Sequence, residues 1–242
     1  MSIRMKFWFA TITIVAVAFV GLVHLAPSDN VDCSKLDQVL DEQLLAQSIT
    51  FRKDKFEFIT SPETMLKYCN RANEAIKTLR RYNRECHKNL TQQIVGSMLK
   101  TRGQYVERVC KPDSDDFKKE VEGLTCAFNI PTSLEDEQKV MRQMQAVVDA
   151  NIEDDKLRAR RTCCTILDCQ KTSLSTYREK CPSTVESFAS YLDSYTSESM
   201  SFVCQDGKNL ECDKLEPLKV GSGEPKLHYL ANVVNLIRTL DH

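Results

Sequence analysis

A repeated spacing of cysteine and tyrosine constrains this sequence more than any other feature. The members of the two copies follow one another at steps of 13, 4 and then 24 or 23 residues: Cys69, Tyr82, Cys86 and Cys110 in the first copy, and Cys164, Tyr177, Cys181 and Cys204 in the second. A spacing shared in this way is typical of a duplicated supersecondary unit. We therefore predict an internal duplication, which describes how the protein is built and names no substrate or reaction.

Apolar residues recur at helical intervals along most of the sequence. After Ser61, a favourable N-cap, and Pro62, which fits a first helical turn, one apolar stripe steps alternately by three and four residues. Ser183 and Glu186 form a capping box that predicts the start of another helix. A further amphipathic helix is expected over 227–237, at the C-terminal end. Since no run alternates like a strand, we predict an all-α fold of disulfide-stabilised helical hairpins.

Helix geometry limits which cysteines can bond. If Cys69 and Cys86 share a helix, their Cα atoms lie about 25 Å apart at 1.5 Å per residue, whereas a disulfide needs roughly 4.4–6.8 Å. A chain reversal near His87–Leu90, and near Pro182 in the second copy, makes each unit a helical hairpin. The hairpins predict two clamping bridges: Cys69–Cys110 and Cys164–Cys204.

The other cysteines are less constrained by spacing. A short returning helix would bring Cys126 near Cys86, which favours that pair. Cys163 and Cys164 point about 100° apart on a helix, so we expect them to serve two different bridges. The remaining candidates for bridges are Cys169, Cys181 and Cys212. Because the count of 11 cysteines is odd, one is unpaired or bonds between chains, and we interpret Cys33 as the unpaired thiol.

The N-terminus has the layout of a secretory signal peptide. Arg4 and Lys6 precede an apolar run over 7–23, and small, turn-prone residues follow it. We predict cleavage after Ser28. The alternative is an uncleaved membrane anchor, because the run approaches the length of a membrane span. In both cases the folded part lies outside the cytosol, where cysteines form disulfides.

We predict four segments along the chain. They are a signal peptide over 1–28, a first helical cysteine-rich half over 29–128, a connecting helix over 129–160, and a second cysteine-rich half over 161–242 that ends in a loop and a helix.

Composition excludes several classes of function. The 33 basic and 34 acidic side chains nearly balance, which argues against a nucleic-acid-binding protein. Few histidines follow the signal and none lies beside a nucleophile motif, so we predict no catalytic residue and no enzyme. Cys163, Cys164 and Cys169 lack the paired spacing of a zinc site, so we predict neither metal nor cofactor.

Asn89 begins the sequon Asn-Leu-Thr at the predicted turn of the first hairpin. A glycan is tolerated at such an exposed turn, and we predict that Asn89 carries one. The alternative is an unused, sterically blocked sequon.

Arg158, Arg160 and Arg161 form an Arg-x-Arg-Arg pattern between the two copies, which resembles furin-type processing sites. Cleavage after Arg161 is one reading. The alternative, which we favour, is a solvated helix face whose charges are balanced by the acidic residues just before it, because a helix presents its backbone poorly to a protease.

Methionine and phenylalanine side chains could line a cavity for a small apolar ligand. They are Met98, Met141, Met144, Met200, Phe117, Phe128 and Phe188. Ordinary core packing is the interpretation that we favour.

The cysteine order of the chain resembles that of secreted, helical, cysteine-rich arthropod proteins related to insect hemolymph glycoproteins and, more distantly, to a nematode domain of unknown function. The resemblance rests on Cys163, Cys164, Cys169, Cys181, Cys204 and Cys212, followed by a Pro/Gly-rich stretch and a helix, with Cys69, Cys86, Cys110 and Cys126 in matching order in the first half. Members often carry another cysteine shortly after the one matching Cys33, where this chain has Asp37, Asp41 and Glu42. The resemblance implies secretion and a helical fold, and no established activity.

Together these features lead us to expect a secreted, non-enzymatic protein that acts by binding an extracellular partner. Two alternatives stay open: a carrier of a small apolar ligand, and a toxin or effector secreted by a gland. A membrane is a partner only if the signal segment is uncleaved.

Overall fold

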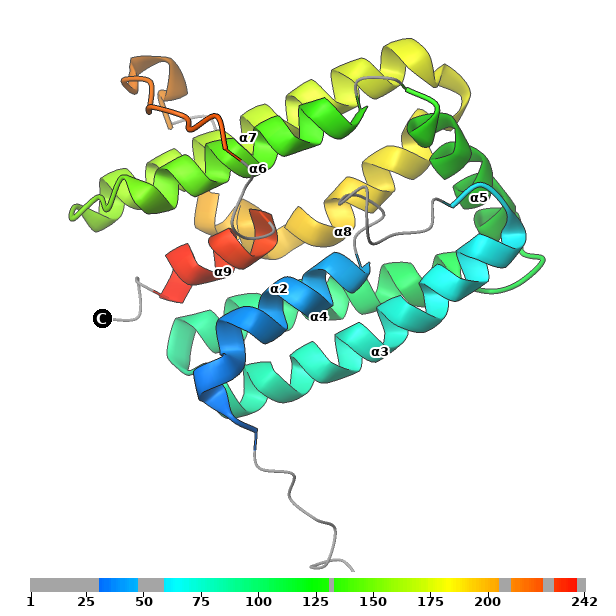
Figure 1. Cartoon of the computed structure of the whole chain (residues 1–242), viewed down its shortest axis with the longest axis horizontal. Helices are drawn as coiled ribbons and strands as arrows, with labels where there is room; N and C mark the ends of the chain where they lie inside the picture. The colour runs from blue at the N-terminus through cyan, green and yellow to red at the C-terminus, as the bar shows by residue number, and fades with distance from the viewer. Residues whose placement is uncertain (1–30, 48–58, 131–132, 205–209, 224–228, 239–242) are drawn as a thin grey trace, which may run out of the picture. The chain divides into compact units, whose positions relative to one another are not determined.

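The computed structural model describes residues 31–47, 59–130, 133–204, 210–223 and 229–238. In this part of the chain there are eight α-helices and no strand, which confirms the all-α prediction. The helices are α2 (Leu36–Gln47), α3 (Pro62–Cys86), α4 (Asn89–Val109), α5 (Asp115–Phe128), α6 (Ser133–Asp149), α7 (Asp155–Lys180), α8 (Val185–Cys204) and α9 (Tyr229–Arg238). Short 3-10 helices cover Cys33–Lys35, Pro182–Thr184 and Cys212–Lys214. All of them lie in the second of the two units into which the chain divides, Cys33–His242 (Figure 1).

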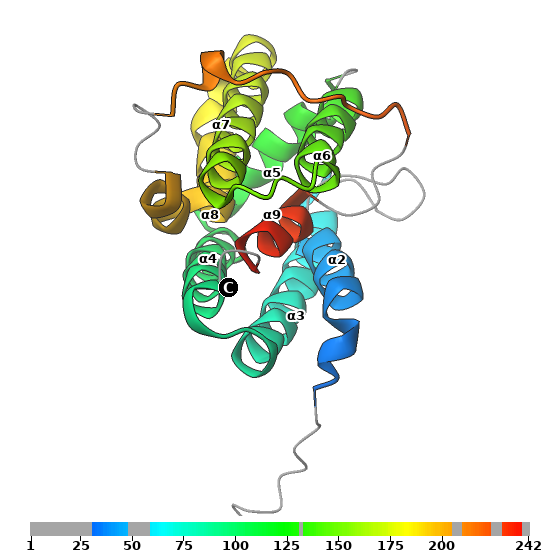
Figure 2. The same cartoon turned by 90° about the vertical axis from the view of Figure 1, so that its left-hand side faces the viewer.

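Two helical hairpins form the frame of this unit, and both chain reversals lie where the sequence predicts them. The α3–α4 hairpin turns at His87 and Lys88, and the α7–α8 hairpin turns at Cys181 and the 3-10 helix Pro182–Thr184. The two hairpins pack on each other through α4 and α8, which lie side by side in both views (Figures 1 and 2). Helix α5 also packs on α4 and α8, so three helices meet where the hairpins join.

The start of α3 follows from its sequence. Ser61 Oγ accepts a hydrogen bond from the backbone N–H of Thr64 at 3.2 Å, and Thr64 Oγ1 accepts one from the backbone N–H of Ser61 at 3.1 Å. This reciprocal cap satisfies backbone donors that have no partner inside the helix. Pro62 occupies the first helical position, where a missing N–H costs nothing.

The predicted capping box at the start of α8 is wrong. Ser183 lies inside the 3-10 helix Pro182–Thr184, and α8 begins only at Val185. The reason is the tight turn after Cys181, in which the backbone N–H of Thr184 donates to the carbonyl oxygen of Cys181 at 3.1 Å. Thr184, the residue that precedes α8, is therefore part of this turn.

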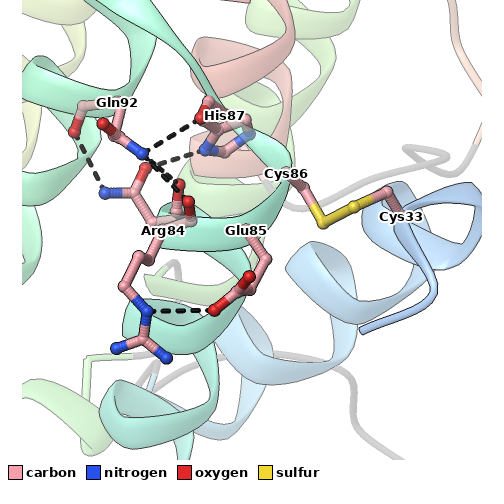
Figure 3. The surroundings of a disulfide bond; sticks show 7 residues. Cys33, Arg84, Glu85, Cys86, His87 and Gln92 are labelled. Atoms are coloured by element: carbon pink, nitrogen blue, oxygen red, sulfur yellow. Dashed lines mark hydrogen bonds and ion pairs between the residues drawn. A yellow bond between two sulfur atoms is a disulfide. The ribbon is translucent and has the colours of Figure 1, made fainter. Parts of the chain in front are cut away.

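Side chains close the reversal between α3 and α4 by binding the last carbonyls of α3 (Figure 3). Gln92 Nε2 donates to the carbonyl oxygens of Arg84 and His87, at 3.0 and 3.1 Å. Asn83 Nδ2 donates to the carbonyl oxygen of Gln92 at 3.0 Å, and Asn83 Oδ1 lies 2.8 Å from Nδ1 of the buried His87. Because the final carbonyls of a helix have no partner within it, these bonds fix the angle at which α4 leaves α3.

Helix α9 lies in the interior, where it packs against α2, α4, α6 and α7 (Figure 2). Its buried apolar side chains are Ala231, Val233, Val234, Leu236 and Ile237. At its end, Arg238 donates a hydrogen bond to Asp37 of α2 at 2.7 Å. The core of the unit is therefore completed by α9, which follows all the surrounding helices in the sequence.

Candidate functional site

The structure contains five disulfide bridges, and all eleven cysteines lie among the described residues. The bridges are Cys33–Cys86, Cys69–Cys110, Cys126–Cys181, Cys163–Cys204 and Cys164–Cys212. The predicted clamp of the first hairpin, Cys69–Cys110, is confirmed, with Cα atoms 5.7 Å apart.

Two expectations about the first half are wrong. Cys33 is not the unpaired thiol: it bonds to Cys86, because α2 packs along α3 and carries the residues just before it to the end of α3 (Figure 3). The favoured pair Cys86–Cys126 does not form. Cys126, in the last turn of α5, instead meets Cys181 at the turn of the second hairpin, with Cα atoms 6.0 Å apart.

The adjacent cysteines of α7 do serve two bridges, as predicted, but with different partners. Cys163 is the clamp to Cys204, and Cys164 bonds to Cys212 in the segment after α8. The predicted pair Cys164–Cys204 is thus wrong by one residue, because the side chain that faces α8 is that of Cys163. Cys169, expected to be a bridge candidate, is the free and buried cysteine.

Eight bonded cysteines form two successive sets with one pattern: Cys33, Cys69, Cys86 and Cys110, then Cys126, Cys163, Cys181 and Cys204. In each set the first cysteine bonds to the third and the second to the fourth. The sequence separations are 53 and 41 in the first set, and 55 and 41 in the second. This matched bond order supports the internal duplication, which stays a prediction.

A buried arginine connects the two hairpins. Arg102 of α4 is 2 % exposed and donates to Ser194 Oγ of α8 at 2.6 Å and to the hydroxyl of Tyr68 in α3. Its guanidinium carbon lies 4.8 Å from the ring centroid of Tyr105 and 5.0 Å from that of Tyr191. Aromatic faces and hydroxyls of this kind stabilise a buried cation.

Glu120 of α5 is the acidic member of this cluster. Tyr105 donates its hydroxyl hydrogen to Glu120 Oε1, and both side chains are buried. Burial raises the pKa of Glu120 to about 7, while the hydrogen bond from Tyr105 and the charge of Arg102 act in the opposite direction. Burial also raises the pKa of Tyr105 well above its usual value. We call the set Tyr68, Arg102, Tyr105, Glu120, Tyr191 and Ser194 the buried arginine cluster.

The buried arginine cluster can bind α3, α4, α5 and α8 to one another, and its side chains direct their hydrogen bonds inward. The buried arginine cluster was not predicted, although the sequence contains a signal for it. Arg102 falls in step with Met98, Tyr105 and Val109 on the buried stripe of α4. Glu120 lies between Phe117 and Leu124 on the buried side of α5 in the same way. A charged residue at a position of the apolar stripe indicates a buried partner.

The Arg-x-Arg-Arg pattern lies in the first two turns of α7. Each arginine donates to a main-chain carbonyl: Arg158 to that of Ile152 (2.9 Å), Arg160 to that of Glu211 (2.6 Å) and Arg161 to that of Glu216 (2.6 Å). Two of them therefore hold the segment after α8 against α7, beside the bridge Cys164–Cys212. The pattern does lie on a helix, but the expectation of a solvated face is wrong, because Arg160 and Arg161 are half-buried against this segment. Processing after Arg161 stays a prediction. A cut there would leave its two products joined through Cys126–Cys181.

Asn89 lies at the reversal between α3 and α4, and its side chain is exposed. Its φ of 46° places it in the left-handed region, which asparagine tolerates better than most residues. Thr91, the third residue of the sequon, is 1 % exposed. A glycan on Asn89 would point to solvent, while the threonine that defines the sequon is covered by the folded hairpin.

The described residues among those proposed to line an apolar cavity pack in the core or against it. Met98, Met144 and Phe117 lie in the main core cluster, and Met141 is also buried. Phe188 is half-buried and stacks on Tyr177, with ring centroids 4.0 Å apart. The side chains of Met200 and Phe128 lie outside the described ones.

Among the described residues no helix is long and apolar enough to cross a membrane, and no group of three histidine, cysteine or acidic side chains could hold a metal ion. The apolar run over 7–23 lies outside those residues. Comparison with protein-family models, with curated proteins and with solved structures finds no match.

Proposed function

We propose that this chain is a secreted, non-enzymatic binding protein. The observation that carries the proposal is the enclosure of its charged groups: inside the helix interface Tyr105 donates a hydrogen bond to Glu120, and the Arg102 guanidinium lies over the Tyr105 ring. Groups enclosed in this way stabilise a scaffold and leave its outer helix faces to meet a partner. Five disulfides support secretion, because such bridges form and persist in oxidising compartments.

A glycan on Asn89 is part of this proposal. The exposed side chain at the hairpin turn supports it. Since Thr91 is buried in the folded protein, transfer of the glycan has to precede closure of the hairpin. A kinship with the secreted arthropod proteins also stays a proposal, and the bond order found here gives it a direct test in those proteins.

The second candidate function is a carrier of a small apolar ligand. The observation that favours it is the fully buried Met144 beside the interior helix α9, because methionine side chains adapt to irregular ligands. A toxin or effector from a gland is a third candidate, and it differs from the first in tissue of origin rather than in structure.

Expression of the full chain in a eukaryotic secretory host tests the proposal. We expect the protein in the medium, with the five bridges found by peptide mapping without reduction and with a mass that falls on glycosidase treatment. Native mass spectrometry of this material decides between binding protein and carrier, because a carrier retains the mass of its ligand until it is denatured. Retention of reduced protein in the cytosol would overturn the proposal, as would activity profiling that labels one acidic side chain or thiol of the folded protein.

A further inference from the structure

Positive charge is concentrated in one segment of the chain. Residues 77–104 contain seven lysine and arginine side chains and one acidic side chain, Glu85, in a protein whose net charge is −1. One of the seven cations is Arg102, which is buried. The other six are exposed: Lys77, Arg80, Arg81, Arg84, Lys88 and Lys100. We call these six residues the basic stripe.

Helix geometry gathers the basic stripe on one side of the first hairpin. Its four members in α3 follow at steps of three, one and three residues, and therefore share a helix face. Arg80 reaches from α3 onto α4, where its Nη2 donates to the carbonyl oxygen of Leu99 at 3.3 Å, next to Lys100. Gly103 leaves the space for this crossing, because a Cβ there would collide with the Arg80 guanidinium. The four cations of α3 therefore share one face, and Arg80 extends this face onto α4.

Two carboxylates pair with members of the basic stripe. Lys77 pairs with Glu74 at 2.7 Å. Arg84 pairs with Glu85 at 3.0 Å, as Figure 3 shows. All four side chains are largely exposed, so these ion pairs are weak and screened by salt. Residues 74–104 carry these six exposed cations and two exposed carboxylates, an excess of four positive charges within the segment. Such a local field attracts a polyanion.

We propose that the basic stripe binds a linear sulfated polysaccharide; this inference rests on the proposed extracellular binding function. The arginines present planar forks that match the oxygens of sulfate and carboxylate groups. Tyr82, the aromatic side chain within α3 at this level, is packed against the core and does not offer its face for base stacking. Leu90 is the exposed apolar side chain of residues 77–104, which is too little for insertion into a membrane. This face offers positive charges, and an extended sulfated polysaccharide supplies the negative charges that match them.

The test uses the folded full chain on immobilised heparin and in solution with heparin fragments. The variant Arg80→Gln/Arg81→Gln/Arg84→Gln removes three cations of the basic stripe. The matched control Lys118→Gln/Lys119→Gln/Lys139→Gln removes three exposed cations of α5 and α6 and changes the net charge equally. Circular dichroism and the thermal midpoint confirm that both variants are folded.

We expect the wild-type protein to be retained on the column at physiological salt. The stripe variant should elute at lower salt, and its Kd for heparin fragments should rise at least tenfold. The Kd of the control variant should change less than threefold. An equal loss in the control, or passage of the wild-type protein through the column, overturns the inference. Tighter binding to duplex DNA or to vesicles containing phosphatidylserine than to heparin, at the same ionic strength, also overturns it. These results are independent of the secretion assay, the bridge mapping and the native mass spectrometry. Failure to bind heparin would therefore leave the proposed function to be decided by those experiments.

Discussion

Arg102 in α4 donates a hydrogen bond of 2.6 Å to the hydroxyl oxygen of Ser194 in α8, 92 residues further along the chain. Ser194 in turn donates to the carbonyl oxygen of Tyr191 at 2.6 Å, and the ring of Tyr191 lies beside the Arg102 guanidinium. One side chain of the first hairpin is thereby bonded to a full turn of the second. Because each bond has a required distance and direction, this contact fixes the position of α8 along α4 more narrowly than apolar packing does.

Replacing this arginine tests its contribution to stability. In Arg102→Met we expect the free energy of unfolding to fall by about 3 kcal/mol, because the buried carboxylate of Glu120 loses a nearby positive charge and two hydroxyls lose their donor. The control Lys100→Met removes an exposed cation from the same helix. It should cost less than about 1 kcal/mol in urea denaturation. Equal losses in the two variants would contradict the role of the buried arginine cluster.

The raised pKa of Glu120 predicts a dependence of stability on pH. The folded protein binds a proton at Glu120 up to about pH 7, whereas the ordinary value of 4.5 applies to the unfolded chain. Between these values the folded state holds more protons, so stability is highest at the acidic end and falls as the pH rises toward 7. The loss is on the order of 3 kcal/mol.

Denaturation of the wild-type protein, Glu120→Gln and Glu122→Gln between pH 4.5 and 7.5 measures this effect. Glu122 is exposed on the same helix, and its replacement should leave the pH dependence as it is. In Glu120→Gln the free energy of unfolding should depend much less on pH over this range. A wild-type slope that survives in Glu120→Gln would assign the dependence to other groups.

Cys169 should be a protected thiol. It is buried in α7 beside Gln143, with Sγ 3.7 Å from Oε1, and burial raises its pKa to about 12. Since the thiolate is the reactive form, a thiol reagent at pH 8 should label no cysteine in the native protein and one per chain after unfolding without reduction. Fast labelling of the native protein, or two thiols in the unfolded one, would show that the bridge assignment is wrong.

Two helical glycines should respond in opposite ways to alanine. At Gly103 the added Cβ meets only the flexible end of Arg80, which can move, so the gain in helix propensity should raise the free energy of unfolding by up to about 1 kcal/mol. At Gly123 the added Cβ would lie 3.3 Å from the hydroxyl of Tyr177 and 3.5 Å from Cβ of Thr184, in the turn of the second hairpin. Overpacking should leave Gly123→Ala less stable than Gly103→Ala by about 1 kcal/mol or more. Equal thermal midpoints would contradict the close contact at Gly123.

Local patterns predicted the helices well and the contacts between them poorly. The cap at Ser61 and both hairpin reversals depend on neighbouring residues, so the sequence reveals them. The partner of Cys33 depends on how α2 packs along α3, which no local spacing contains. The wrong prediction of Cys164, in place of Cys163, as the partner of Cys204 has another cause. Identical spacing to Tyr177 favoured Cys164, whereas the side that faces α8 is set by rotation about the helix axis, about 100° for each residue.

Composition does not reveal which charged residues form the buried arginine cluster. Arg102 and Glu120 count among the 33 basic and 34 acidic side chains, most of which are solvated. Their positions on apolar stripes were the available sign, but the partners Tyr68 and Ser194 come from other helices and could be found only in three dimensions. The basic stripe is the opposite case, because its helical steps can be counted in the sequence once α3 is located.

The place of α9 in the interior has a consequence for the order of events during synthesis. A ribosome makes α2, α4, α6 and α7 before it makes the helix that they enclose. The bridges Cys33–Cys86 and Cys69–Cys110 join residues that are all made before α9, so they can close before the interior helix is present. Early oxidation would then hold α2, α3 and α4 together until residues 229–238 are made.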